Sequence, residues 1–394
     1  MAFDYQAPLP KESFLLDPSV AFLNHGSFGA TLRVVFEKYQ AWQREMEAQP
    51  VQFLVGRFAE LMREARTALA AYVHTAPDNL VYVTNATTAL NIVAHSLRLG
   101  PGDEILTTNH EYGAMDRMWR FLCRKTGAVY RPVPVPLPVT TPEAMADRIW
   151  AGVTSRTRVL FFSHLTSPTA LVFPARELCR RARAAGLLSI VDGAHALGQI
   201  PLDLDDLGAD FYTANAHKWL CAPKGSAFLY ARPAVQALVE PLVVSWGDAA
   251  FSPSGSPFLD EQQWTGTRDL AAFLAVPEAI RFCQSHDWDR VRTHCHALAR
   301  HAREQVGALT GLPQVCPDSP DWYAQMTTVP LPRCDSARFK AQLYDRHRVE
   351  VPVMDWEGGQ YLRVSIQAYN TLADVARLIE ALRDAGVTRR PTGC

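Results

Sequence analysis

The sequence has little of what would indicate a membrane, a nucleic acid or an oxidising compartment. Its 39 basic and 40 acidic residues leave no excess of positive charge, so it lacks the basic face that nucleic acids and anionic membranes require. No apolar run approaches the roughly 18 to 20 residues needed to cross a bilayer, and the first residues show neither region of a secretory signal. The eight cysteines are scattered without paired metal-ligand spacing, which is typical of reduced thiols. We therefore expect a cytoplasmic protein that binds no membrane, no nucleic acid and no metal.

Between residues 80 and 230, short apolar segments alternate with segments of helical periodicity. Segments 104–108 and 158–164 are examples of the apolar runs, and each is followed by a helical pattern. This alternation predicts an α/β fold, with a mostly parallel sheet between two layers of helices. Ligands of such sheets bind beyond the carboxyl ends of the strands. Segment 222–230 is expected to be a further strand, antiparallel if it forms a hairpin with the strand in segment 211–219.

The sequence divides into three expected parts. Residues 1–30 form an N-terminal arm, of which 1–20 is extended, residues 31–275 a large ligand-binding domain, and residues 276–394 a small C-terminal α/β domain with the arm packed nearby. Within these parts, 52–57 is expected to be a connector and 270–286 one helix. The proline-rich stretch 131–138 is expected to be an edge strand or an extended connector.

Two apolar segments lead into ionisable side chains that suit one cofactor. Segment 188–191 leads into Asp192, and segment 211–215 precedes Lys218. A lysine can form a Schiff base with pyridoxal phosphate (PLP), and a carboxylate can keep the pyridine nitrogen of PLP protonated, so that the ring accepts electrons. Because neighbouring parallel strands end at the same edge of a sheet, the two side chains are expected to lie close together. The pair predicts a PLP site with Lys218 and Asp192 as catalytic groups.

Other polar side chains follow the predicted strands at the same edge. The turn after segment 81–83 places Thr87 and Thr88 at a helix N-terminus, where free backbone N–H groups can bind phosphate; Thr87 could instead only cap the helix. Tyr112 follows segment 104–108 and could stack on a cofactor ring, or could be an amphipathic surface aromatic. Three histidines also fall at or just past strand ends, namely His164, His195 and His217. Their convergence is a stronger argument than any one residue.

Two further segments suit a small-molecule substrate. Residues 24–29 predict a polar, glycine-rich loop whose backbone can approach a ligand closely. Arg363 is a lone guanidinium in the apolar strand 361–366, and its planar fork fits a carboxylate. Alternatively, Arg363 could form a structural ion pair with Asp355 or Glu357.

Taken together, these segments resemble class V aminotransferases of PLP fold type I, a group that includes cysteine desulfurases, kynureninases and isopenicillin N epimerases. The resemblance covers nearly the whole chain. Its specific motifs are Val191-Asp192-Gly193-Ala194-His195, Ala216-His217-Lys218, Gly266-Thr267, and Arg363-Val364-Ser365 with Tyr369-Asn370-Thr371. Within the class, residues 23–29, 110–114 and 349–353 are most similar to the isopenicillin N epimerase-like branch. The resemblance implies a large domain built on a seven-stranded type of sheet, and a small C-terminal domain.

The resemblance also implies roles around the cofactor ring. Lys218 would carry the internal aldimine, Asp192 would pair with the pyridinium nitrogen, and His195 would bond the phenolic oxygen. Tyr112 would stack on the ring, where relatives often carry histidine.

The remaining implied roles concern the phosphate and the substrate. The expected phosphate ligands are Thr87, Thr88 and His217, with Gly266 and Thr267 contributed by the neighbouring subunit. A phosphate site completed by a second chain implies a homodimer with a shared active site. Arg363 would bind the α-carboxylate of an amino-acid substrate, and Asn24 and His25 are expected nearby.

The reaction itself is left open by the residues. Cysteine desulfurases carry a nucleophilic cysteine shortly before the carboxylate-binding arginine, whereas residues 349–360 contain none, which disfavours persulfide chemistry. Lys218 is expected to take a proton from the substrate α-carbon. Epimerisation then needs an acid on the second face, for which Tyr112, His25 and His110 are candidates. Our leading expectation is an epimerase or racemase; the alternatives are a C–S (β-) lyase, an aminotransferase, or a PLP-binding homodimer without catalysis.

Overall fold

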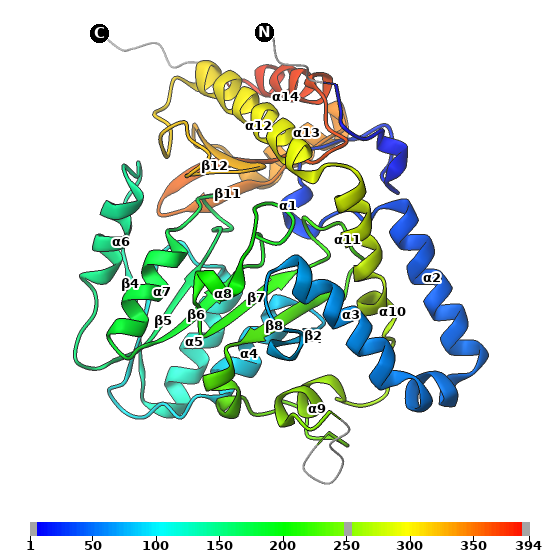
Figure 1. Cartoon of the computed structure of the whole chain (residues 1–394). Coiled ribbons are helices and arrows are strands. Elements are labelled where there is room, and N and C mark those ends of the chain that lie inside the picture. Colours follow the sequence, from blue (N-terminus) through cyan, green and yellow to red (C-terminus); the bar gives the residue numbers. More distant parts are fainter. Residues whose placement is uncertain (1–5, 248–253, 388–394) are drawn as a thin grey trace.

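A seven-stranded sheet forms the centre of the molecule (Figure 1). The structure is a computed structural model and describes residues 6–247 and 254–387. In the order of pairing, the sheet contains β2 (Leu80–Val83), β8 (Ala227–Ala231), β7 (Phe211–Asn215), β6 (Leu188–Asp192), β5 (Thr157–Ser163), β3 (Glu104–Thr108) and β4 (Val129–Val133). β8 is antiparallel to both of its neighbours, and all other pairs are parallel. The structure thus confirms the expected α/β fold, including the antiparallel return of β8.

Helices cover the sheet because its inner strands are apolar on both faces. Every residue of the inner strands β3, β7 and β8 is buried, and so is every residue of the edge strand β2, as expected of strands with a helical layer on each side. β4 is more exposed and lies at the edge of the sheet, which confirms the edge position predicted from its prolines. The helices between residues 30 and 287 are α2 (Arg33–Ala48), α3 (Phe58–Tyr72), α4 (Ala86–Ser96), α5 (Gly113–Thr126), α6 (Pro142–Trp150), α7 (Ala175–Ala184), α8 (Leu204–Leu207), α9 (Pro257–Gln263), α10 (Ala271–Leu274) and α11 (Val276–Ser285).

The C-terminal part forms a second, smaller α/β unit at the top of Figure 1. Its antiparallel sheet has the order β11 (Val353–Trp356), β12 (Gly359–Ser365) and β9 (Met326–Leu331). The accompanying helices are α12 (Trp288–Thr310), α13 (Ser336–His347) and α14 (Leu372–Asp384). Arg363 therefore lies on the central strand of this sheet. The domain boundaries at residues 30 and 275 stay predictions.

The N-terminal segment joins this smaller unit to the site. β1 (Ala21–Phe22) pairs in parallel with β10 (Val349–Glu350), and the Ser365 N–H donates to the Leu23 carbonyl at 2.9 Å. The segment that follows, α1 (His25–Phe28), is thereby held beside the end of β12. In this way a segment from the start of the chain reaches Arg363.

The expected loop at residues 24–29 is wrong, since it contains the helical turn α1. Asn24 stands before the turn, and Gly29 ends it with a φ of 69°. The two glycines predict a loop by their local preference. In the structure they are needed instead because their neighbours leave no room for a Cβ. A Cβ on Gly26 would lie 2.8 Å from the Met326 sulfur, and one on Gly29 would lie 2.0 Å from the His217 carbonyl oxygen.

Three other local expectations are also corrected. The extended arm at residues 1–20 contains a 3-10 turn, η1 (Lys11–Ser13), while residues 1–5 lie outside the described part. The connector at 52–57 is largely a π-helical turn, η2 (Gln52–Gly56). The helix expected at 270–286 is divided into α10 and α11 at Ala275. Pro277 explains the division, because its ring clashes with the preceding turn and it has no N–H to donate.

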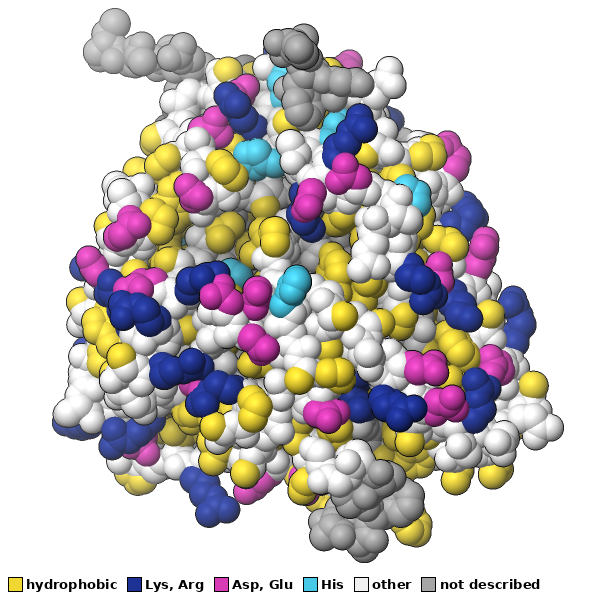
Figure 2. Space-filling model, in the orientation of Figure 1, with side chains coloured by type: hydrophobic (Ala, Val, Ile, Leu, Met, Phe, Trp, Pro, Cys, Tyr) yellow, Lys and Arg dark blue, Asp and Glu magenta, His cyan; other side chains and the backbone are white. Residues whose placement is uncertain are grey.

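The surface is consistent with the balanced charge of the sequence. On the face shown in Figure 2, basic and acidic side chains are interspersed. Within residues 6–247 and 254–387, no helix is both long enough and apolar enough to cross a membrane.

Candidate active site

A pocket at the carboxyl ends of the central strands collects most of the residues expected at the site. It is lined by Ser27, Phe28, Asn85, Ala86, Thr87, Tyr112, Ser163, Leu165, Ser167, Asp192, Ala194, His195, Asn215, His217 and Lys218. These residues come from α1, from the N-terminus of α4, and from the segments that follow β3, β5, β6 and β7. The structure therefore brings Thr87, Tyr112, Asp192, His195, His217 and Lys218 together. The expected relation between strand ends and a ligand site explains this convergence.

Asp192 ends β6 as a buried acid with an incomplete set of partners. It is 4% exposed, and its Oδ1 accepts a hydrogen bond from the Ala194 N–H at 2.9 Å. Burial raises the pKa of Asp192, while the Ala194 N–H and the charge of Lys218 oppose that shift. A buried carboxylate without a bonded cation is costly. The Asp192 carboxylate therefore fits a ligand that brings a protonated ring nitrogen as a donor.

Lys218 follows β7 and faces the same pocket. Its Nζ lies 3.1 Å from Nε2 of His195. Burial, helped by the positive charge of Arg363, lowers the pKa of Lys218 to about 7, although Asp192 acts in the opposite direction. A lysine with such a pKa is partly neutral near pH 7, and the neutral amine is the form that attacks an aldehyde or takes a proton.

This shift predicts how the cofactor-free protein takes up PLP as the pH changes. Because the folded-state pKa is lowered, the neutral amine of Lys218 accumulates on raising the pH through about 7 instead of about 10.4. We expect the rate of covalent PLP attachment to rise between about pH 6 and pH 8 and then to level off. Stopped-flow absorbance measures this rate. A rate that still climbs between about pH 9 and pH 10 would contradict the assigned shift.

His25 holds the backbone at Lys218 through a hydrogen bond. Its Nε2–H donates to the Lys218 carbonyl at 3.0 Å, and its Nδ1 accepts from the Tyr369 hydroxyl at 3.1 Å. His25 is fully buried and does not line the pocket. The structure thus places it as a support for the lysine turn and not at the expected substrate position.

The N-terminus of α4 lies at the pocket, as expected of an anion site, but the roles of Thr87 and Thr88 differ from those expected. Asn85, and not Thr87, is the N-cap, since its Oδ1 accepts from the Thr88 N–H at 2.8 Å. The Thr88 hydroxyl also lies 3.1 Å from Asn85 Oδ1, so Thr88 belongs to the cap and does not line the pocket. Thr87 does line it, at the positive end of the helix dipole. Asn215 completes the arrangement by accepting from the Ala86 N–H at 2.9 Å.

Arg363 is prepared for an anion and is not part of an ion pair. Its Nη1 donates to the Ser167 carbonyl at 2.8 Å and to the Ser167 hydroxyl at 3.0 Å, and its Nη2 donates to the Ser27 hydroxyl at 3.0 Å. Its Nε is buried without a partner, and burial lowers the pKa of this guanidinium to about 10. The alternative, a salt bridge to Asp355 or Glu357, is not formed in the described part of the chain, where the partners of the Arg363 guanidinium are Ser167 and Ser27.

Ser27 connects Arg363 to the N-terminal segment. Its hydroxyl donates to Asn24 Oδ1 at 2.6 Å, and Asn24 Nδ2 donates to Glu350 Oε1 at 3.0 Å. Asn24 therefore lies near Arg363, as expected, but it acts through Ser27 and does not line the pocket. Because Ser27 and Ser167 line the pocket, the Arg363 fork is held directly behind it.

Tyr112 lies at the mouth of the pocket and follows two buried residues, His110 and Glu111. It is 48% exposed, whereas His110 is fully buried and bonded to Thr169 and to the Val135 carbonyl. The Glu111 carboxylate accepts from the Thr108 hydroxyl at 2.6 Å and the Ser163 hydroxyl at 2.7 Å. Of these three consecutive residues, Tyr112 alone lines the pocket.

Several residues at the site were missed from the sequence. Glu111 is one, and burial raises its pKa to about 8; the others are Asn85, Asn215, Ser27, Ser163 and Ser167. Asn215 and Ser163 could have been found from their positions at the last residues of strands, and Ser27 from its motif. His164, expected at the same edge of the sheet, does not line this pocket, and its Nδ1 lies 2.9 Å from the Tyr212 hydroxyl.

Gly266 and Thr267 do not line the Lys218 pocket of their own chain. They follow α9, which Figure 1 places at the opposite end of the molecule from the small C-terminal unit. Among the described residues, no cluster of three or more His, Cys, Asp and Glu side chains could hold a metal ion.

The fold and the site together define a class of enzyme. A mostly parallel seven-stranded sheet with a buried acid and a lone lysine at adjacent strand ends is the architecture of PLP enzymes of fold type I. The chain belongs to the class V aminotransferase family, whose model ("Aminotransferase class-V") matches residues 27–378. The protein is accordingly a PLP-dependent enzyme.

Named relatives and solved structures agree with this assignment. The chain is 40% identical to isopenicillin N epimerase of Amycolatopsis lactamdurans, over 95% of this chain and 97% of the relative. It is 37% identical to isopenicillin N epimerase of Streptomyces clavuligerus, over 93% and 95%, and 29% identical to a probable L-cysteine desulfhydrase of Arabidopsis thaliana, over 93% and 83%. Its fold matches a cysteine desulfurase from Escherichia coli with a TM-score of 0.81 and 21% identity, covering 95% of this chain and 97% of that chain.

Proposed function

We propose that this enzyme is an epimerase or racemase, which inverts the configuration at the α-carbon of an amino-acid substrate. The observation that carries the proposal is the meeting, in one pocket, of a lysine whose pKa is about 7 with a buried acid and an arginine-backed wall. The 37–40% identity to two isopenicillin N epimerases over most of the chain supports inversion as the outcome.

In this proposal the chain's own groups move and stabilise charge. Bound PLP supplies an electron sink that makes the Cα–H bond of an attached amino acid acidic. Lys218 Nζ takes the α-proton on one face, since its lowered pKa makes it a competent base near pH 7. Asp192 would hold a proton on the ring nitrogen, and His195 would donate to the phenolic oxygen. Thr87 and His217 would hold the phosphate.

Inversion also needs a proton donor on the second face. We assign this role to Tyr112, because it lines the pocket and lies at its exposed mouth. The two other candidates, His25 and His110, are fully buried and bonded elsewhere. In this assignment Tyr112 would also stack on the cofactor ring.

Arg363 is expected to decide substrate affinity. Changing Arg363 to Lys keeps one positive charge but removes the fork that grips a carboxylate, at a cost of roughly 1.5–3 kcal/mol for charge-assisted bonds. We expect KM to rise ~10- to 100-fold, with a smaller change in kcat. Steady-state kinetics measure both. The matched control is Arg333→Lys, since Arg333 binds only the Gly358 carbonyl among the described contacts; equal KM values for the two variants would contradict the assignment.

A second candidate function is C–S lysis. It is favoured by the similarity to a probable L-cysteine desulfhydrase, and the steps up to removal of the α-proton would be shared. No described residue lining the pocket is a cysteine, so a persulfide-forming route is not part of either proposal.

Two parallel incubations distinguish epimerisation from C–S lysis. The purified holoenzyme is given isopenicillin N in one sample and L-cysteine in another, and chiral chromatography and sulfide detection are applied to both. We expect epimeric product from the first and no sulfide from the second. Release of sulfide and pyruvate from L-cysteine, with no epimer formed from isopenicillin N, would contradict the epimerase proposal and support C–S lysis.

We further propose that the enzyme works as a homodimer with shared active sites. An apolar groove, lined by Leu54, Val55, Phe58, Trp246 and Trp264, opens beside the segment that carries Gly266 and Thr267. Trp246 is 75% exposed and Val55 71% exposed, which is unusual for such large apolar side chains on a surface with no partner. A second copy of this chain would cover the groove and receive Gly266 and Thr267 at its phosphate site.

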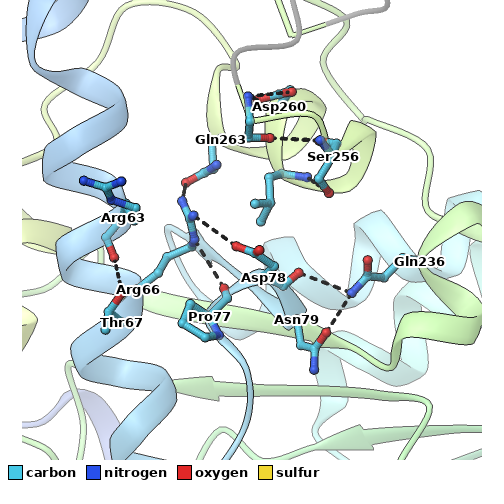
Figure 3. Close-up of polar contacts among 12 residues, drawn as sticks. Arg63, Arg66, Thr67, Pro77, Asp78, Asn79, Gln236, Ser256, Asp260 and Gln263 are labelled. Carbon is cyan, nitrogen blue, oxygen red and sulfur yellow. Dashed lines mark hydrogen bonds and ion pairs between the residues drawn. The ribbon is translucent and has the colours of Figure 1, made fainter.

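The helix that precedes this segment, α9, is anchored to α3 of its own chain (Figure 3). Arg66 of α3 points toward α9 and donates to Gln263 Oε1 and, at 3.3 Å, to the Pro77 carbonyl. The Phe58 and Trp264 rings meet edge to face, with centroids 4.8 Å apart. These contacts hold the chain at Gln263 and Trp264, two residues before Gly266.

Mixing two inactive variants tests the shared site. In the proposed dimer, a chain carrying Lys218→Ala and a chain carrying Thr267→Trp would form a heterodimer with one fully intact site. Random reassortment should therefore restore about one quarter of wild-type activity. If Thr267 acted within its own chain, every site would be damaged and the mixture would stay inactive, which is the contrary outcome.

A further inference from the structure

A buried tryptophan directly after the lysine contacts the histidine that faces it. Trp219 Nε1 donates to His195 Nδ1 at 3.3 Å, and His195 Nε2 lies 3.1 Å from Lys218 Nζ. We propose that Trp219 is a positioning residue, which locks His195 in the tautomer that carries its proton on Nε2. This inference rests on the proposed role of Lys218 and His195 at the cofactor and assigns a residue to control it.

The chemistry of the indole decides the tautomer. An indole N–H can donate a hydrogen bond but cannot accept one. His195 Nδ1 must then offer its lone pair, so a neutral imidazole carries its hydrogen on Nε2. His195 is 3% exposed, and burial lowers its pKa well below the ordinary value, as do the positive charges of Lys218, Arg363 and His217 around it. The ring therefore remains neutral, with one defined donor atom.

The tryptophan itself is rigidly placed. Trp219 is fully buried and packs with Ala170 and Met326. Its ring centroid lies 5.1 Å from that of His25, and a Cβ on Gly198 would lie 2.5 Å from the Trp219 carbonyl carbon. Because Trp219 is the next residue after Lys218, one turn sets both the lysine and the histidine tautomer.

The direction of the Nε2–H bond matters for the site. Pointed into the pocket, this N–H can donate to the neutral amine of Lys218 or to an anionic oxygen of the cofactor, which it stabilises. The opposite tautomer would present a lone pair to that oxygen and repel it. Trp219 thus acts through His195 on the ionisation of whatever His195 faces.

The test removes the indole N–H and keeps the aromatic ring. In PLP-loaded Trp219→Phe, nitrogen-15 NMR of histidine-labelled protein should show His195 no longer held in the Nε2–H form. The pH midpoint of the cofactor's visible absorption should rise by about one unit, because the oxygen loses its donor. We expect kcat to fall ~10-fold, with little change in KM.

Two controls separate this role from simple packing. Trp119 is also fully buried, but its Nε1 has no hydrogen-bond partner within the described chain, so Trp119→Phe should leave the midpoint and the His195 signals unchanged. In a His195→Gln background, which has no tautomer to fix, Trp219→Phe should add no further shift.

The outcomes that overturn the proposal are specific. An unaltered His195 tautomer and an unaltered midpoint in Trp219→Phe would reduce Trp219 to a packing residue, as would an equal shift in the His195→Gln background. The spectroscopic readouts need only bound PLP. They therefore stand even if the enzyme proves to be a lyase and not an epimerase.

Discussion

Replacing Lys218 with alanine is expected to abolish covalent attachment of PLP and to lower the rate of α-proton exchange by ~10³-fold or more. The reason is that Lys218 supplies both the nucleophile and the base. Its Nζ faces the pocket that contains Asp192, and burial lowers its pKa to about 7. Borohydride reduction followed by intact-mass spectrometry measures the attachment. Proton NMR in D₂O measures the exchange.

A neighbouring lysine provides the control for this experiment. Lys224 is also partly buried and its Nζ donates to the Gly29 carbonyl at 3.0 Å, but it lines a different pocket. Lys224→Ala should keep the reduced adduct at one cofactor per chain. An adduct that persists in Lys218→Ala and disappears in Lys224→Ala would show that Lys224, and not Lys218, attaches the cofactor.

Replacing Asp192 with asparagine is expected to have the second largest effect. Asparagine keeps the shape and can still bond the Ala194 N–H, but it cannot hold a proton on the ring nitrogen by its charge. Each unit by which the pKa of that nitrogen falls weakens the protonated form by about 1.36 kcal/mol. We expect α-proton exchange to slow by ~10²- to 10³-fold.

The cofactor should nevertheless remain bound in this variant, since Lys218 and the N-terminus of α4 are untouched. Retained absorbance and a retained reduced adduct verify that the site is folded. Asp192→Glu restores the charge with a longer side chain and should recover part of the exchange rate. Exchange at the wild-type rate in Asp192→Asn would show that the carboxylate does not serve the ring nitrogen.

The centre of the site was predictable because its signals are local. An apolar run that ends in Asp192, and another that precedes Lys218, each identify a strand end without any knowledge of the rest of the chain. Parallel pairing then requires the two ends to meet, as β6 and β7 do. The antiparallel return of β8 was predictable for the same reason.

The surroundings of the site were not predictable, because they depend on contacts distant in sequence. Arg363 is held by Ser27, 336 residues away, and by Ser167, 196 residues away. Nothing near Arg363 in the sequence distinguishes this arrangement from a salt bridge. The same holds for Trp219 and His195, whose hydrogen bond requires knowledge of two turns at once.

The errors also have local physical causes. Asn24-His25-Gly26-Ser27-Phe28-Gly29 contains two glycines, which favour a loop by propensity, yet packing against Met326 and His217 requires them in and beside a helical turn. Similarly, the sequence allows Thr87 as the cap of α4, but Asn85, two residues earlier, caps the helix. In both cases tertiary context overrides a weak local preference.

Deuterium incorporation at the substrate α-carbon tests the central claim most directly. Wild-type holoenzyme and Lys218→Ala supplied with PLP are incubated in D₂O with isopenicillin N, and both epimers are separated and analysed by mass spectrometry. We predict deuterium at the α-carbon of both epimers with the wild-type enzyme and of neither with Lys218→Ala. Inversion without solvent deuterium, or undiminished exchange in Lys218→Ala, would contradict the claim that Lys218 moves the α-proton.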